Sequence, residues 1–152
     1  MKGLTRHLVA LLPILCLACN RTVLVHSYLP VSEDGWRRTD TLFFPLPPSP
    51  NEASYSLYVG LRIHNRFSYR EVWLAVEHRM EGENHWTCDT LCLPLSDDEG
   101  HLVGQGINLL QYEIPAGSLH MQTQQAGELR IHHLMRLETL PHIMEVGIKL
   151  AP

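Results

Sequence analysis

Apolar and polar residues alternate along several stretches of this chain, and the longest of these is residues 55–64. Every second residue there is apolar, in the order Tyr, Leu, Val, Leu and Ile. A period of two places these side chains on one face of a β-strand, whereas a helix would scatter them around its circumference. Residues 72–76 alternate in the same way after a polar segment. We predict that both stretches are strands and that they pair as an antiparallel hairpin.

Shorter stretches with the same character are separated by turn-forming residues. We predict strands at residues 22–30, 36–46, 85–95, 107–114, 129–135 and 146–150. Loops are expected at residues 47–53, 96–106 and 122–127, and Pro-Ala-Gly at 115–117 is expected to end a strand. Residues 134–140 fit at most one helical turn. About eight strands at this spacing predict an all-β fold, a single antiparallel β-sandwich of jelly-roll or immunoglobulin-like type.

Residues 1–19 differ from the rest and predict a lipoprotein signal peptide. Lys2 and Arg6 precede an apolar run that is too short to span a membrane, which takes about 20 residues. Residues 16–19 (Cys-Leu-Ala-Cys) resemble a bacterial lipobox, in which the final cysteine is lipidated. We predict a signal peptide at 1–18, a lipidated tether at 19–22 beginning with Cys19, and a β-sandwich domain at 23–152. The alternative is an ordinary signal peptide cut near Ala18, which would leave a soluble protein.

Charge and length limit the classes of partner. The chain has 152 residues, with 16 acidic against 12 basic ones and no basic cluster, so nucleic acid is not an expected partner. The mature part is the size of one domain. Several acyl chains on Cys19 would hold that domain at a membrane surface, because one chain alone binds only marginally.

No set of residues predicts catalysis or metal binding. His85, Cys88 and Cys92 could suggest zinc, but on a strand the two cysteines lie about 13 Å apart, too far to share an ion or to form a disulfide. The acidic residues 97–100 lack the alternating oxygen ligands of a calcium loop. No nucleophile-elbow motif is present. We expect no cofactor, no metal and no enzymatic activity.

Aromatic side chains support an alternative function as a module that binds carbohydrate or peptide. Tyr58 and Trp73 alternate away from the apolar faces of their strands, so we expect both to be exposed. An exposed ring on a sandwich also occurs simply on an outer face or at an edge. A shared exposed patch would distinguish a binding platform from such isolated rings.

Two short motifs suggest O-glycosylation. Thr41 and Thr90 each lie in an Asp-Thr-Leu sequence, which resembles the Asp-Ser/Thr-aliphatic motif of bacterial periplasmic glycosylation. A strand interior is a poor place for a glycan, so Thr41, close to an expected strand end, is the better candidate. Both remain candidates at this stage.

Three longer segments resemble the GldH family of gliding-motility lipoproteins. They are residues 55–76, with a Tyr-x-Leu-x-Val-x-Leu-Arg-x-x-Asn strand and turn, residues 89–106, with an acidic Gly-x-x-x-Gly-x-Gly loop, and residues 129–150, with a closing Val-Gly-x-x-Leu strand. The resemblance covers most of the chain after residue 36. Cys92 departs from it, because a polar or charged residue is expected at that strand position.

The resemblance implies a membrane-anchored lipoprotein that supports gliding motility and the associated type IX secretion machinery. It brings no catalytic residues, so we expect contacts with other envelope lipoproteins or proteins of such an apparatus. The sheet faces and the loop at 96–106 are the candidate contact surfaces. Residues 20–22 (Asn-Arg-Thr) lack the acidic cluster of many surface-exported lipoproteins. We therefore expect the domain to face the periplasm, anchored to the outer membrane.

Overall fold

The computed structural model describes residues 22–152, so the predicted signal peptide and Cys19 lie outside the described residues. Within this range the chain forms strands and no helix. The strands are β1 (Val25–Pro30), β2 (Trp36–Arg37), β3 (Leu42–Leu46), β4 (Ala53–His64), β5 (Glu71–Met80), β6 (Thr87–Pro94), β7 (Leu109–Met121), β8 (Gly127–His133), β9 (Thr139–Leu140) and β10 (Ile143–Ala151). The all-β prediction is confirmed, and the suggested helical turn at 134–140 does not form.

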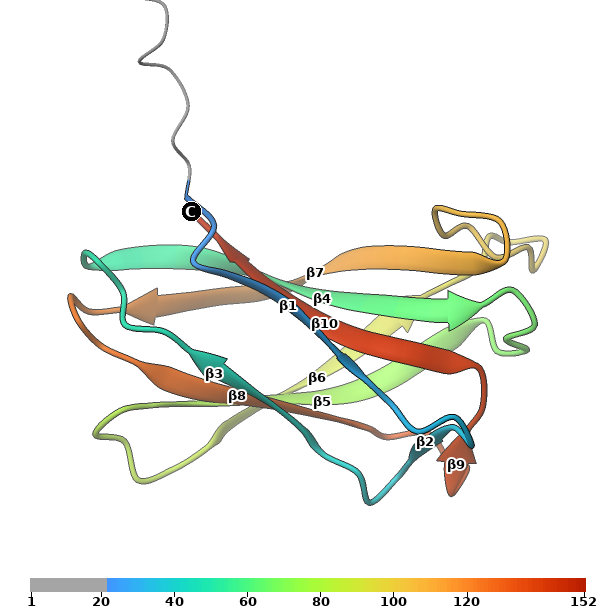
Figure 1. Cartoon of the computed structure of the whole chain (residues 1–152), viewed down its shortest axis with the longest axis horizontal. Coiled ribbons are helices and arrows are strands. Elements are labelled where there is room, and N and C mark those ends of the chain that lie inside the picture. The colour runs from blue at the N-terminus through green and yellow to red at the C-terminus, as the bar shows by residue number, and fades with distance from the viewer. Residues whose placement is uncertain (1–21) are drawn as a thin grey trace, which may run out of the picture.

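Two antiparallel sheets of four strands pack face to face (Figure 1). The first has the order β1-β10-β4-β7 and the second the order β3-β8-β5-β6, and β2 and β9 add a small two-stranded sheet. We call the first the anchor sheet, because it contains β1, the first strand after the predicted lipid anchor, and the second the far sheet. This arrangement is the predicted sandwich.

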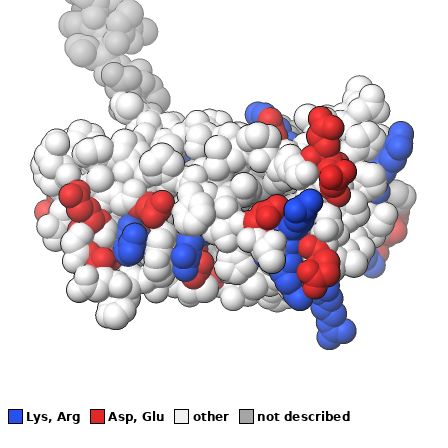
Figure 2. Space-filling view, turned by 60° about the horizontal axis from the view of Figure 1, so that its bottom comes forward, with Lys and Arg blue, Asp and Glu red and all other residues white. Residues whose placement is uncertain are grey.

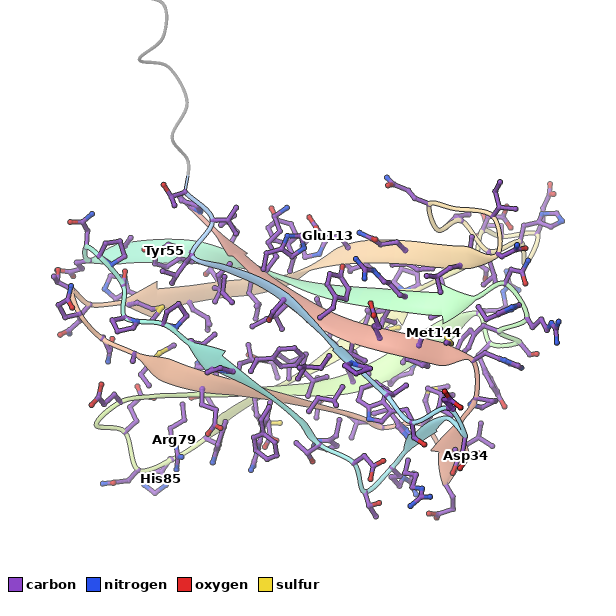
Figure 3. All side chains as sticks on the ribbon, in the orientation of Figure 1. Asp34, Tyr55, Arg79, His85, Glu113 and Met144 are labelled. Carbon is purple, nitrogen blue, oxygen red and sulfur yellow. The ribbon has the colours of Figure 1, made fainter. Side chains whose placement is uncertain are left out.

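The apolar faces of both sheets meet in one core, and side chains fill the space between the ribbons (Figure 3). The predicted inward residues of residues 55–64 are all buried, with exposures of 4% or less. Glu113 of β7 and Arg79 of β5 are labelled on opposite sides of this core in Figure 3. The predicted inward residues of three other strands are also buried: Val72, Leu74, Val76, Leu129, Ile131, Val146, Ile148 and Leu150.

The predicted hairpin between residues 55–64 and 72–76 is wrong. β4 pairs with β7 and β10, whereas β5 pairs with β6 and β8 in the other sheet. The connection between them crosses the edge of the sandwich, and Phe67 within it is 5% exposed and belongs to the core. Tyr69 packs against the Phe67 ring edge-on, with centroids 5.4 Å apart. Burying these aromatic side chains directs the chain across the core instead of back along β4.

The Pro-Ala-Gly segment does not end a strand, contrary to our prediction. β7 continues through it, and the register with β4 shifts between Leu57 and Tyr58, which face Gly117 and Pro115. The extra residue is a β-bulge, and Gly117 adopts a φ of +110° that other residues rarely reach. Pro115 is tolerated because β7 is an edge strand, where a missing N–H breaks no ladder. After the bulge the odd-numbered residues face inward, which buries Leu119 and Met121.

The predicted strand at 36–46 is two strands, β2 and β3, joined by a turn. The Trp36 indole is fully buried, and its Nε1 donates to the carbonyl oxygen of Asp40 at 2.9 Å. This bond closes residues 36–40 into a turn and separates the two strands. His133, also fully buried, lies against Trp36 edge-on, with centroids 5.3 Å apart.

The two ends of the described chain lie together. The Leu24 N–H donates to the Leu150 carbonyl oxygen at 2.9 Å, which extends the pairing of β1 with β10 to the start of the domain. The described chain therefore begins beside the C-terminus, left of centre in Figure 1. No helix among residues 22–152 is long and apolar enough to cross a membrane.

Candidate functional site

The connection from β6 to β7, residues 95–108, is an ordered loop at the right-hand end of the molecule in Figure 1. We call it the glycine loop, because it contains Gly100, Gly104 and Gly106. An antiparallel bridge joins Ser96 to Leu102, and a second joins Gln105 to Gln111. These bridges make the loop part of the sandwich rather than a free segment.

The acidic part of the glycine loop is a closed turn. The Asp97 carboxylate accepts from the His101 backbone N–H at 2.8 Å, and the Gly100 N–H donates to the Asp97 carbonyl oxygen at 3.0 Å. These backbone donors, together with His101, lower the pKa of Asp97. The Arg70 guanidinium donates to the carbonyl oxygens of Asp97 and Asp98 at 2.8 and 2.9 Å. The carboxylates therefore shape the turn and are not arranged as a metal cage.

Two glycines let the loop lie close to the sandwich. A Cβ atom at Gly104 would lie 2.5 Å from the Tyr112 ring. Gly106 has a φ of +132°, and a Cβ there would overlap the carbonyl oxygen of Leu109. Tyr112 is buried, which raises its pKa, and its hydroxyl donates to the Leu95 carbonyl oxygen at 2.8 Å. Both glycines are thus required by close backbone approach.

The asparagine that ends the Tyr-x-Leu-x-Val-x-Leu-Arg-x-x-Asn motif holds the far side of this loop. The Asn65 side chain donates to the Ile107 carbonyl oxygen at 3.2 Å, and the Asn65 N–H donates to the Asn108 carbonyl oxygen at 2.9 Å. Two motifs that lie about 40 residues apart in the sequence therefore meet at one end of the molecule.

Three large apolar side chains in the glycine loop and at the start of β7 are exposed, namely Val103, Ile107 and Leu109, and we call this set the apex patch. Their exposed fractions are 58%, 86% and 47%, high for large apolar side chains. Ile107 lines a hollow of about 520 Å³, together with the apolar side chains of Phe67 and Leu110. Exposed apolar side chains on a loop that also carries carboxylates suit a contact with another protein better than they suit catalysis.

A second organised surface lies on the outer face of the anchor sheet. The Tyr28 ring of β1 lies across Gly60 of β4 and Gly147 of β10. A Cβ at Gly147 would lie 2.6 Å from the ring, and one at Gly60 would overlap its hydroxyl. The Arg62 guanidinium stacks over the same ring at 4.1 Å and pairs with Glu145. Burial raises the pKa of Tyr28. Gly147 is the glycine of the Val-Gly-x-x-Leu motif, and a glycine is needed there because the Tyr28 ring lies directly over it.

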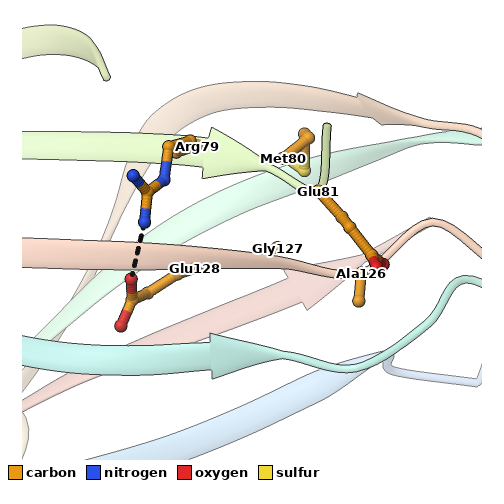
Figure 4. Close-up of a pocket in the computed structure, with 6 residues that line it drawn as sticks. All are labelled: Arg79, Met80, Glu81, Ala126, Gly127 and Glu128. Atoms are coloured by element: carbon orange, nitrogen blue, oxygen red, sulfur yellow. Dashed lines mark ion pairs between the residues drawn. The ribbon is translucent and has the colours of Figure 1, made fainter. Parts of the chain in front are cut away.

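The outer face of the far sheet carries paired charges. Arg130 donates to both carboxylate oxygens of Glu77 at 2.7 and 3.1 Å, which lowers the pKa of Glu77, and its guanidinium stacks on Trp86 at 4.0 Å. A hollow of about 380 Å³ at the ends of β5 and β8 is crossed by an ion pair between Arg79 and Glu128 at 3.7 Å (Figure 4). Figure 2 shows basic and acidic side chains intermingled in small groups, with no broad area of one sign on the face presented.

The structure does not bring the two candidate aromatic residues together. Tyr58 lies half-buried on the outer face of the anchor sheet, beneath the Lys149 ammonium at 5.2 Å. Trp73 is 41% exposed on the outer face of the far sheet, where its Nε1 donates to Glu71 at 2.8 Å. The core lies between the two rings, so they do not form a shared platform.

The remaining candidate residues are dispersed. Thr41 is half-buried just before β3, whereas Thr90 is exposed on β6. Cys88 and Cys92 are both free thiols on β6, and burial with nearby Glu77 and Glu71, respectively, raises their pKa values. Among residues 22–152 no group of three or more His, Cys, Asp or Glu side chains is placed to hold a metal ion.

Sequence reasoning missed the residues that position the glycine loop. Asn65 and Arg70 are far from it in sequence, Tyr112 lies just after it in β7, and none of the three carries a local signal of that role. Ile107 and Leu109 were counted toward a strand beginning at residue 107, because an apolar side chain does not reveal whether it is buried. The glycine spacing and the acidic turn are the available signals, and the loop that they predict at 96–106 is confirmed as part of the connection from β6 to β7.

Comparison with known proteins identifies relatives over almost the whole described range. The sequence model of the GldH lipoprotein family matches residues 23–150. The gliding motility lipoprotein GldH of Flavobacterium johnsoniae is 24% identical over 149 residues, which cover 90% of this chain and 89% of that protein.

Two solved structures show weaker similarity. A family GH115 4-O-methyl-alpha-glucuronidase superposes with a TM-score of 0.40 at 12% identity; the match covers 88% of this chain and only 18% of the enzyme. The C-terminal domain of the sugar-binding protein EclA superposes with a TM-score of 0.34 at 14% identity, over 88% of this chain and 79% of that domain.

Proposed function

Because the chain belongs to the GldH lipoprotein family, we propose that it is a lipid-anchored, non-catalytic β-sandwich that supports gliding motility and the associated type IX secretion machinery through contacts with other envelope proteins. The observation that carries this proposal is the family match, which extends over residues 23–150. The named relative is a gliding motility lipoprotein, and the match covers most of both chains.

A membrane anchor would increase the occupancy of weak contacts with partners on the same membrane. We propose that lipidated Cys19 confines the domain to a membrane surface; the first described residues, next to which this anchor would attach, lie beside the C-terminus. Confinement raises the effective concentration of partners on the same membrane, so contacts of modest area can be occupied. We place the anchor in the outer membrane, with the domain in the periplasm, because residues 20–22 carry no acidic export signal.

We propose that the glycine loop is the contact surface. The apex patch is held by bonds from Asn65 and by the close approach of two glycines, so little conformational entropy is lost when it binds. The Asp98 and Glu99 side chains of the same loop are exposed and give the loop negative charge. The partner surface we expect is apolar at its centre with basic residues around it.

The carbohydrate-binding alternative required a shared aromatic platform. Tyr58 and Trp73 lie on separate sheets, so no such platform supports that function. We therefore do not propose it.

Deletion and complementation in the native host test the proposal. Loss of the gene should impair surface spreading and protein secretion, and the wild-type gene should restore both. A Cys19→Ala form should restore them poorly, because the domain loses its anchor. A Val103→Asp, Ile107→Asp form should remain anchored and also fail, whereas Phe43→Asp, which changes an apolar side chain 49% exposed on the far sheet, should complement fully. Full complementation by the Cys19→Ala form, or normal spreading and secretion without the gene, would contradict the proposal.

A further inference from the structure

β6 is an edge strand of the far sheet, and its outer side is open. It pairs with β5 only, and no other strand among residues 22–152 covers it. Residues 87–90 are exposed on both faces of the strand, because this part of the edge extends beyond the core. An open edge with exposed backbone groups is a template for pairing with another strand.

The backbone pattern shows which residues face that opening. The Leu95 N–H donates to the Arg70 carbonyl oxygen at 2.8 Å, so Leu95 faces β5. Backbone groups alternate sides along a strand, so Leu93, Leu91 and Asp89 also face β5. Cys88, Thr90 and Cys92 therefore present their N–H and C=O groups to the open edge. Pro94 also faces the open edge, so its missing N–H removes no hydrogen bond to β5.

The two free thiols are spaced symmetrically about Thr90. Cys88 and Cys92 lie two residues on either side of it, on the outer face of the sheet. Within one copy they are too far apart to pair. When two β6 strands align antiparallel with Thr90 opposite Thr90, each Cys88 stands directly opposite the partner's Cys92. Other antiparallel registers in which residues 88, 90 and 92 still face the partner strand do not place both cysteines opposite a cysteine.

We propose that the open edge of β6 pairs with β6 of a second copy of this chain, antiparallel and centred on Thr90, and that Cys88 of each copy forms a disulfide with Cys92 of the other. Directly opposite residues of a hydrogen-bonded pair have Cα atoms about 5.5 Å apart, within the range that disulfides span. Residues 88, 90 and 92 of the two copies would exchange about six backbone hydrogen bonds. The register places no like charges opposite each other, since Asp89 faces the partner's Leu91.

The chemistry of the link is a two-electron oxidation for each disulfide. Two thiols lose two protons and two electrons, and a sulfur–sulfur bond forms. The electron acceptor is a disulfide, in the envelope that of a thiol oxidoreductase and in the test glutathione disulfide, which is reduced to two glutathione molecules. The Cys92 thiol donates to a Glu71 carboxylate oxygen at 3.5 Å, and burial raises the pKa of both thiols, which favours the protonated form, so the test is run at pH 8.5.

Disulfide formation in cells requires an oxidising compartment and therefore rests on the proposed envelope location. The strand pairing does not depend on that location, so an experiment on purified protein tests the pairing separately. The full chain, extracted in detergent, is incubated with glutathione disulfide, blocked with N-ethylmaleimide and run on a non-reducing gel. We expect a dimer that dithiothreitol dissociates. Cys88→Ser and Cys92→Ser should each lose at least 90% of it. Mixing the two variants, made with tags of different length, should restore a heterodimer, because one Cys88–Cys92 pair remains.

A register-independent thiol reaction would give a different result. If Cys88→Ser or Cys92→Ser alone cross-links as well as the wild type, or if the mixed variants give no heterodimer, the proposed pairing is wrong. Thr90→Lys places two ammonium groups opposite each other and should reduce the dimer at least fivefold, whereas Thr123→Lys, at an exposed turn position between β7 and β8, should not. A glycan on Thr90 would lie at the centre of the proposed strand pair, where the two Thr90 residues face each other. An intact mass showing that all molecules are glycosylated there would therefore also overturn the pairing. Dimer formed by purified protein but not in native membranes would contradict the envelope location alone.

Discussion

Replacing Gly147 by alanine tests whether the outer face of the anchor sheet is built around Tyr28. A Cβ at this position would lie 2.6 Å from Tyr28 Cδ1 and 2.7 Å from two further ring atoms. The ring cannot withdraw freely, because Arg62 stacks on it at 4.1 Å and Gly60 lies beneath its hydroxyl. Overpacking of this kind costs about 1–3 kcal/mol, against a gain of about 0.5–1 kcal/mol for replacing a strand glycine. We expect Gly147→Ala to lower the free energy of unfolding by about 1–2 kcal/mol.

The double variant isolates the steric cause. In a Tyr28→Ala background the obstructing ring is gone, so Gly147→Ala should raise the free energy of unfolding by about 0.5–1 kcal/mol. The coupling between the two positions should therefore be about 1–3 kcal/mol. Urea unfolding of residues 22–152, followed by tryptophan fluorescence, to which the buried Trp36 contributes, measures the wild type and the three variants. A coupling below about 0.5 kcal/mol would refute the reasoning, because Gly147→Ala would then act independently of the ring.

Further predictions concern the loop, a buried histidine and an ion pair. Gly106→Ala requires a non-glycine residue at φ +132° and should destabilise the chain by about 1–3 kcal/mol, measured by thermal unfolding. Asn65→Ala removes the bond to the Ile107 carbonyl and should speed hydrogen exchange of the glycine loop, while exchange in β10 stays unchanged. Burial lowers the pKa of His133, so the folded state binds fewer protons; its contribution to stability is complete above about pH 6.5 and is lost as the pH falls below that value, and a His133→Leu variant should lose less stability between pH 7 and pH 5. The Arg130 bond lowers the pKa of Glu77, so the stability that Glu77 contributes is present above about pH 4.5 and is lost as the pH falls through its folded pKa; Glu77→Gln should flatten the stability profile in that acid range.

The strands were predictable because burial on one face imposes a period of two on the sequence. Residues 55–64 and 146–150 show it clearly, and their inward side chains are those that the pattern indicated. Strand pairing was not predictable from the same signal. A short polar connection suggests a hairpin, and only the burial of Phe67 between the sheets reveals that the chain crosses the sandwich there. Pro115 likewise read as a strand end, because its tolerance depends on β7 being an edge.

The candidate site was predictable as a segment but not as a surface. Glycine spacing and acidic residues marked 96–106, since glycines at fixed spacing indicate special backbone geometry. The contacts that hold the loop come from Asn65, Arg70 and Tyr112, and those contacts depend on how β4 and β7 pair. The period-two pattern correctly indicated that Trp73 points outward, but it could not show that Tyr58 lies on the other side of the core.

Photo-crosslinking from Ile107 in the living host tests the central claim, that the anchored domain acts by binding envelope proteins through the glycine loop. A photoreactive amino acid replaces Ile107, which is 86% exposed, and a matched strain carries it at Phe43 on the far sheet. Both strains must first spread and secrete normally, which shows that the label does not disturb the protein. We predict a discrete adduct with another envelope protein from position 107 that is absent from position 43 and is lost with Cys19→Ala. The same adducts from both positions, or no adduct from position 107 in a strain that still glides and secretes, would contradict the account.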